Sequence, residues 1–111
     1  MTPSPSPECD IVADVTFLPT KDGGRKGAVT VGYRPSHDFG IDGFSDGTHR
    51  FVGKEWVAPG ESVRSQICLL FPEYFVGQLY VGQRFNVTEG PWVVANATIV
   101  DIPNVFLRKP G

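Results

Sequence analysis

The chain has 111 residues, which corresponds to one domain and leaves room for only a modest core. Hydrophobic residues make up 41% and charged residues 20%, as in a soluble globular protein, and 13 glycines with 10 prolines argue against a helical bundle. The formal charge of −2 and a pI of about 5.6 exclude a global electropositive field, so any contact with nucleic acid must be local.

The sequence carries no segment typical of a membrane or secreted protein. Residues 1–7 lack both the basic start and the apolar stretch of a signal peptide. No apolar run approaches the roughly 20 residues that a membrane-spanning helix needs. We therefore expect a cytoplasmic protein without membrane contact. Cys9 and Cys68 are expected to stay reduced, although the sequence leaves a bridge between them open.

The two ends of the chain are expected to lie outside the folded domain. Residues 1–10 form a leader rich in proline and serine, which cannot join the interior of a sheet, so we expect it to be disordered or extended. Residues 103–111 are expected to form a loose tail. A single domain over residues 11–102 remains.

Within that domain, apolar and polar residues alternate, and no window keeps the helical period. Residues 11–18 form the first expected strand, followed by a turn at residues 21–24 whose glycines permit a positive φ. A loop is expected at residues 43–47, and turns are expected near residues 59–60 and 89–91. The remaining strands are expected at residues 28–33, 37–41, 48–52, 62–70, 83–88 and 92–102.

Short strands with turns about every 8–12 residues are typical of an antiparallel barrel or sandwich. Closure into a barrel suits so short a chain because it removes exposed sheet edges. The core is expected to form from apolar side chains on one face of the strands: Val15, Phe17, Val29, Val31, Val63, Ile67, Leu69, Phe85 and Val94.

Four motifs follow one another along the chain. They are a Gly-Gly-Arg loop ending at Arg25, a Gly-Tyr-Arg-Pro strand end at residues 32–35, a Pro-Gly-acidic turn at residues 59–61, and an Arg-Phe…Glu-Gly hairpin at residues 84–90. In these motifs the sequence resembles the C-terminal β-barrel, domain III, of bacterial elongation factor Tu. The resemblance covers about residues 11–102 and implies an all-β fold: a single closed, six-stranded antiparallel β-barrel with Greek-key connections.

The resemblance also implies local contacts with tRNA. In the family, the arginine of the loop faces the T-stem backbone, which corresponds to Arg25 with Lys26 beside it. Glu89 corresponds to a glutamate that touches a T-stem base pair. Ser36 and Ser45 stand where the family has glutamine and threonine, and both keep a hydrogen-bonding group.

The last hairpin departs from the family, because residues 88–92 replace two cations and introduce Trp92. We interpret Trp92, Trp56, Tyr74 and Phe75 as candidate contacts with a protein partner, since aromatic residues dominate interface hot spots. Tyr74 and Phe75 lie in a stretch that is longer than its counterpart in the family.

A second group of polar residues could in principle build a metal or acid–base site: His37, Asp38, Asp42, Asp46 and His49. Their spacing fits no short metal motif, and the glycines among them favour a polar surface loop. We therefore expect no catalytic residue and no metal site. The sequence also contains no P-loop, so we expect neither GTP binding nor any other cofactor.

Two functions remain open. The first is a non-enzymatic module for protein–protein interaction linked to translation, which binds another protein or a second copy of itself. The alternative is an RNA-binding module with residual recognition of the T-stem of aminoacyl-tRNA.

Overall fold

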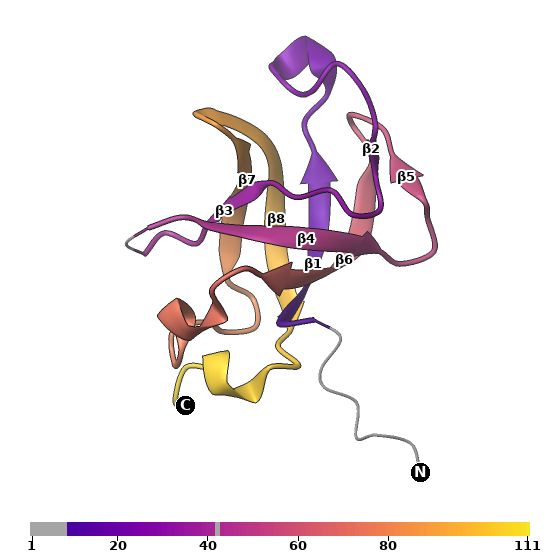
Figure 1. The fold of residues 1–111 in the computed structure, drawn as a ribbon. Coiled ribbons are helices and arrows are strands. Elements are labelled where there is room, and N and C mark those ends of the chain that lie inside the picture. The colour runs from indigo at the N-terminus through magenta and orange to yellow at the C-terminus, as the bar shows by residue number, and fades with distance from the viewer. Residues whose placement is uncertain (1–8, 42) are drawn as a thin grey trace.

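The computed structural model describes residues 9–41 and 43–111, and six antiparallel strands close into a barrel (Figure 1). The strand order is β1-β6-β4-β3-β7-β8, and β8 pairs back onto β1, with Ala97 opposite Val15. This confirms the expected closed, six-stranded barrel. The barrel strands are β1 (Ile11–Phe17), β3 (Ser36–Asp38), β4 (Ser45–Phe51), β6 (Ser62–Leu69), β7 (Arg84–Glu89) and β8 (Trp92–Asp101).

The remaining elements are short. β2 (Val29–Thr30) and β5 (Trp56–Val57) form a separate two-stranded sheet, and the three 3₁₀ helices are η1 (Thr20–Asp22), η2 (Pro72–Phe75) and η3 (Val105–Leu107). The strand expected at residues 28–33 is wrong beyond Thr30. Gly32 has a φ of +93° and turns the chain, and Val31 is 48% exposed instead of buried.

The core follows the alternation of apolar and polar residues along the strands. In β1, β4 and β6 every second residue is buried, as expected for strands with one face toward a barrel interior. Of the nine expected core side chains, all except Val31 are buried. Cys9 and Cys68 form no disulfide with each other, in agreement with the expectation of reduced cysteines.

Residues 43–47 are only partly the expected loop, because β4 begins at Ser45. Gly47 lies inside this strand, where a β-carbon would come within 2.9 Å of Cε1 of His37 and 3.1 Å of the Cys68 carbonyl oxygen. Glycine is therefore present here for close approach between a backbone and a buried ring, and its presence does not mark a turn.

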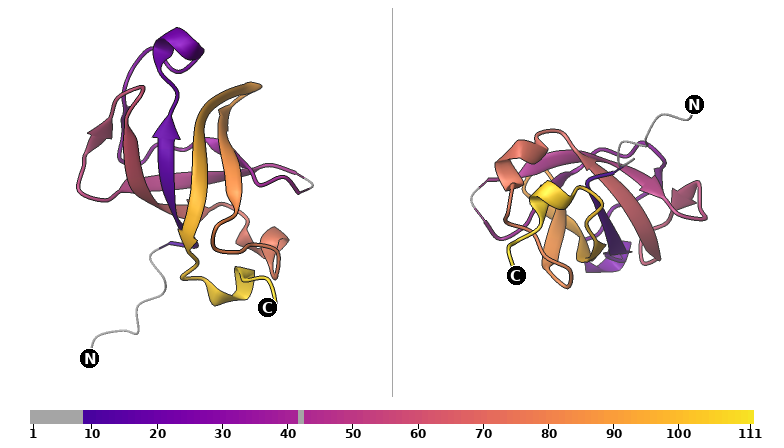
Figure 2. Two further views of the ribbon diagram at one scale, coloured as in Figure 1. Left: turned by 180° about the vertical axis from the view of Figure 1, so that it is seen from behind. Right: turned by 90° about the horizontal axis from the view of Figure 1, so that it is seen from below.

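The C-terminal tail is packed against the barrel, which corrects the expectation of a loose tail at residues 103–111. Leu107 is buried, its carbonyl accepts a hydrogen bond from the Leu79 amide at 2.9 Å, and the Lys109 amide donates to the Leu79 carbonyl at 2.7 Å. Figure 2 shows η2 and η3 together at one end of the barrel, with η1 and the β7–β8 hairpin at the other.

The N-terminal leader is described only in part. The disorder expected for residues 1–10 falls mainly on residues 1–8, which lie outside the described residues. Cys9 is buried, and Asp10 accepts a hydrogen bond from the Leu69 amide at 2.7 Å. These two residues therefore belong to the folded domain.

Candidate functional site

The loop that carries Arg25 is shaped by Gly24. Its amide donates to the Pro19 carbonyl at 3.0 Å, and a β-carbon at this position would collide with the backbone of Leu18. The chain can turn this tightly only with glycine, and the turn brings Arg25 toward the β7–β8 hairpin.

Arg25, Tyr33 and Glu89 form one cluster at this end of the barrel. The Glu89 carboxylate accepts hydrogen bonds from both the Arg25 guanidinium and the Tyr33 hydroxyl. The guanidinium also lies over the Tyr33 ring, 5.5 Å from its centroid. Burial, followed by the hydrogen bond to Glu89, raises the pKa of Tyr33 well above its usual range, so this hydroxyl stays a donor.

The five residues that are expected to contact tRNA differ in whether they are available to a ligand. Arg25 and Glu89 are brought together, but they bind each other, and Lys26 beside them is exposed. The Ser36 hydroxyl donates to the Asp46 carboxylate. Ser45 is only 4% exposed, so its hydroxyl is not available to a ligand in this structure.

His37 and His49 lie inside the barrel, which corrects the interpretation of this segment as a polar surface loop. Both side chains are fully buried, and their Nε2 atoms are 2.8 Å apart. His37 Nδ1 is 2.7 Å from the Ser45 carbonyl oxygen, and His49 Nδ1 is 2.8 Å from the Ser65 hydroxyl.

These contacts assign every proton in the chain of hydrogen bonds. The Ser45 carbonyl can only accept, so His37 donates from Nδ1 and accepts at Nε2. His49 then donates from Nε2 and accepts the Ser65 hydroxyl proton at Nδ1. Burial lowers the pKa of His37 to about 4, and burial together with His37 lowers the pKa of His49 well below its usual range. Both rings are therefore neutral, and each ring nitrogen has a hydrogen-bond partner.

The alternation in β4 could have revealed this placement. Ser45, Gly47, His49 and Phe51 share one parity in the sequence, and Phe51 is the obvious core residue among them. The glycines obscure this pattern in the sequence, because glycine is typical of loops.

In the η2 segment, Phe75 points into the barrel and Tyr74 is exposed to solvent. Phe75 is buried against Phe39, with ring centroids 5.2 Å apart, so it anchors the segment and is not the exposed partner contact that was expected. Tyr74 is 70% exposed, and its ring lies 5.9 Å from that of Phe71.

Further exposed apolar side chains lie on or beside η2, on η3 and on the loop that carries Phe44. The Gly77 amide after η2 donates to the Phe106 carbonyl at 2.9 Å, which joins η2 to η3, and Phe44 borders the same hollow of about 560 Å³ as Tyr74. Sequence reasoning missed Phe44 and Phe106, because only the fold brings them to η2. We call this surface the η2–η3 face, and it comprises Phe44, Phe71, Tyr74, Val76, Val105 and Phe106.

The two tryptophans are exposed elsewhere on the molecule. Trp92 is 71% exposed at the start of β8, on the hairpin at the opposite end of the barrel from η2. Trp56 is 56% exposed on β5. Trp92 and Tyr74 therefore do not belong to one continuous face.

Comparison of the sequence with models of known protein families found no match. Within residues 9–41 and 43–111, no three histidine, cysteine or acidic side chains gather in a way that could hold a metal ion. The same part of the chain has no helix long and apolar enough to span a membrane.

Proposed function

We propose that this protein is a non-enzymatic binding module whose partner is another protein that docks on the η2–η3 face. The observation that carries the proposal is the exposure of Phe44, Tyr74 and Phe106, at 66%, 70% and 76%. Single exposed apolar side chains are ordinary, but a group of them at one end of a small domain is typical of an interaction surface.

The composition of this face suits a protein partner. Four of its six side chains are aromatic, and the charged residues Glu73 and Lys109 are near its members in the sequence. An aromatic centre within a polar rim is the usual anatomy of a protein–protein interface. The side chains are held by a rigid support, because Phe75, Leu79 and Leu107 beneath them are fully packed.

The resemblance to domain III of elongation factor Tu supports a partner linked to translation. That domain packs on another domain of its own factor, so its surface is shaped for protein contact. A second copy of this chain would use the same apolar face and is the simplest form of the proposal.

A non-catalytic role is supported by the position of the two histidines. These are the side chains best suited to proton transfer near neutral pH, and both are buried and hydrogen-bonded to each other. The RNA-binding alternative is less well supported, because Glu89 already engages the guanidinium of Arg25 and thereby balances its charge.

The test compares the double variant Tyr74→Ala/Phe106→Ala with the matched control Trp56→Ala/Trp92→Ala, which removes two exposed aromatic rings elsewhere. Sedimentation measures self-association, and quantitative affinity capture measures binding of a partner. We expect the first variant to lose binding, at a cost of about 2 kcal/mol or more, while the control binds as the wild type does.

A wild-type protein that stays monomeric at high concentration and captures no partner would contradict the proposal. Loss of binding only in the tryptophan variant would place the interface elsewhere. Salt-sensitive binding of aminoacyl-tRNA without protein binding would favour the alternative function.

A further inference from the structure

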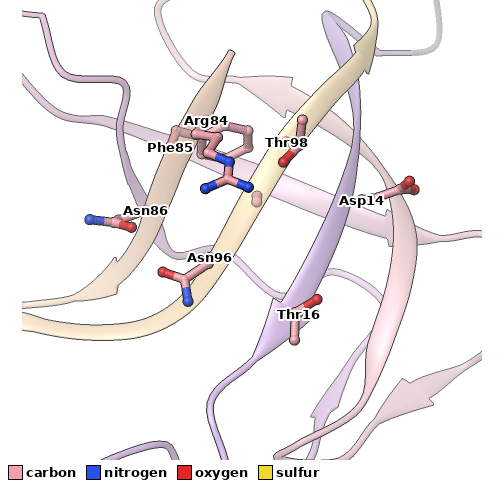
Figure 3. Close-up of a pocket in the computed structure, with 8 residues that line it drawn as sticks. Asp14, Thr16, Arg84, Phe85, Asn86, Asn96 and Thr98 are labelled. Atoms are coloured by element: carbon pink, nitrogen blue, oxygen red, sulfur yellow. The ribbon is translucent and has the colours of Figure 1, made fainter. Parts of the chain in front are cut away.

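The outer face of strands β7, β8 and β1 carries a hollow of about 620 Å³ (Figure 3). Unlike the apolar η2–η3 face, it is lined mainly by polar side chains. Its walls are polar side chains, and its floor is formed by Phe85 and Ala97, which are almost fully buried. Two smaller hollows share residues with it, one toward β3 and one toward β6. Together the three hollows cover five neighbouring strands, and we call them the groove.

Strand register arranges the polar side chains of this groove in two rows. Asn86 pairs with Asn96, and Asn96 is followed on β1 by Thr16. In the next row, Arg84 pairs with Thr98, which is followed on β1 by Asp14. Outward side chains that are cross-strand neighbours lie within reach of one small ligand.

Two charged side chains line the central hollow, Asp14 and Arg84, and they differ in one respect that decides its ligand. Asp38 lines the neighbouring hollow toward β3, where its Oδ1 accepts the Gly40 amide at 2.9 Å. Asp14 is held by both Nε and Nη2 of Arg64, at 2.8 and 3.1 Å, so its charge is already balanced. Arg84 has no ion pair or hydrogen bond from its side chain within the described part of the chain. Its guanidinium points between β7 and β8, toward the side of the groove where Thr98 stands (Figure 3).

The neighbours of Arg84 are also unused hydrogen-bonding groups. The side chains of Asn86, Asn96 and Thr98 make no hydrogen bond to any described residue. Two amides and a hydroxyl can both donate and accept, which matches the alternating donors and acceptors of a ligand rich in hydroxyl groups. The guanidinium matches a carboxylate or a phosphate, because its planar fork can bind two oxygens at once.

Other classes of ligand fit the groove poorly. Binding of single-stranded nucleic acid requires exposed aromatic side chains and several cations. Among the described residues that line the hollow, the one aromatic side chain, Phe85, is 4% exposed, and Arg84 is the one cation without an ion pair. A hydrophobic protein surface would leave these amides without partners, at a cost in free energy.

We propose that this groove binds a small, polyhydroxylated anion, of the class of acidic sugars and sugar phosphates, with Arg84 on the anionic group and Asn86, Asn96 and Thr98 on the hydroxyls. The site is independent of the η2–η3 face. A failure of either proposal therefore leaves the other standing.

The test is an NMR titration of the full chain with three probes: glucuronate, glucose 6-phosphate and neutral glucose. We expect shifts of the Asn86 and Asn96 side-chain amides and of the β7 and β8 backbone, with a dissociation constant on the order of 1 mM for an anionic probe and at least about tenfold weaker binding of glucose. Binding of glucuronate alone assigns a carboxylate, and binding of glucose 6-phosphate alone assigns a phosphate.

Arg84→Gln should weaken binding of the anionic probe at least about tenfold, because it removes the one cation lining the hollow that has no ion pair among the described residues. The matched control is Arg34→Gln, which neutralises an exposed arginine that does not line the groove. Both variants should keep the dispersed spectrum of the wild type. The proposal is overturned by equal affinity for glucose, by undiminished binding in Arg84→Gln, by shifts confined to other surfaces, or by no shift at about 20 mM of any probe.

Discussion

At the scale of single residues, the buried His37–His49 pair is the most unusual feature of the core. Burial normally disfavours histidine, yet here each ring nitrogen has a partner, from the Ser45 carbonyl through both rings to the Ser65 hydroxyl. Neutral rings suit this arrangement, because a proton added to His37 Nε2 would face the His49 Nε2 donor. A proton added to His49 Nδ1 would require the Ser65 hydroxyl to accept instead of donate.

The first prediction is that acid destabilises the fold through these histidines. The pKa of His37 is about 4 in the folded state, against an ordinary 6.5, and that of His49 is also lowered. Below about pH 6.5 the unfolded chain therefore binds protons that the folded chain does not, so stability is complete above that pH and falls as the pH drops toward 4. His37 alone should account for about 3 kcal/mol over this window.

Urea denaturation between about pH 7 and pH 5 measures the upper part of this effect, about 2 kcal/mol for His37. The matched control is His37→Leu/His49→Leu, in which the loss of stability over this window should be clearly smaller whatever its absolute stability. Asp46 lies near His37 and favours its charged form, so it opposes the shift without reversing it. A pH dependence that is the same in both proteins would refute the assignment.

At the scale of elements, β4 shows how one small residue permits a buried polar pair. The Cβ that alanine would add at position 47 lies 2.9 Å from the His37 ring and 3.1 Å from Ile67. β4 is also bonded on both sides, to β3 and to β6, so it cannot move away from the ring without disturbing the barrel.

The second prediction is that Gly47→Ala destabilises the protein by about 1–3 kcal/mol, as expected for overpacking in a tight core. The matched control is Gly27→Ala. At that position an added Cβ meets nothing within 4 Å and φ is not positive, so we expect little change. Chemical denaturation of the two variants measures both values, and equal stabilities would show that the close approach at Gly47 carries no cost.

At the scale of the whole molecule, η3 closes one end of the barrel with one face and exposes the other. Leu107 is 1% exposed and its neighbour Phe106 is 76% exposed. The same division occurs in η2, where Phe75 is buried and Tyr74 is not. Each short helix therefore links stability on one side to the proposed interface on the other.

The third prediction separates these two roles. Leu107→Ala should cost about 2–4 kcal/mol of stability, because it leaves a cavity beneath the end of the barrel. Phe106→Ala should change stability by less than about 0.5 kcal/mol and should affect only binding. Thermal denaturation measures both effects. A large loss of stability from Phe106→Ala would mean that its ring is packed and is not part of a free surface.

The sequence alone predicted an antiparallel barrel or sandwich, because alternation in β1, β6 and β8 and the turns between them are local properties. The choice of a closed six-stranded barrel came from the family resemblance, and the structure confirms it. The sequence also named Arg25 and Glu89 as contacts for RNA, which stays a prediction, although the structure places the two side chains in contact with each other. Only the tertiary structure decided that these two charges neutralise each other, and that Gly47 serves a buried ring rather than a turn. It likewise brought Phe44 beside Tyr74, joined η3 to η2, and aligned Arg84 with Thr98 and Asn86 with Asn96 across the strands. These relations depend on strand register and barrel closure, which join residues far apart in the chain and leave no local pattern.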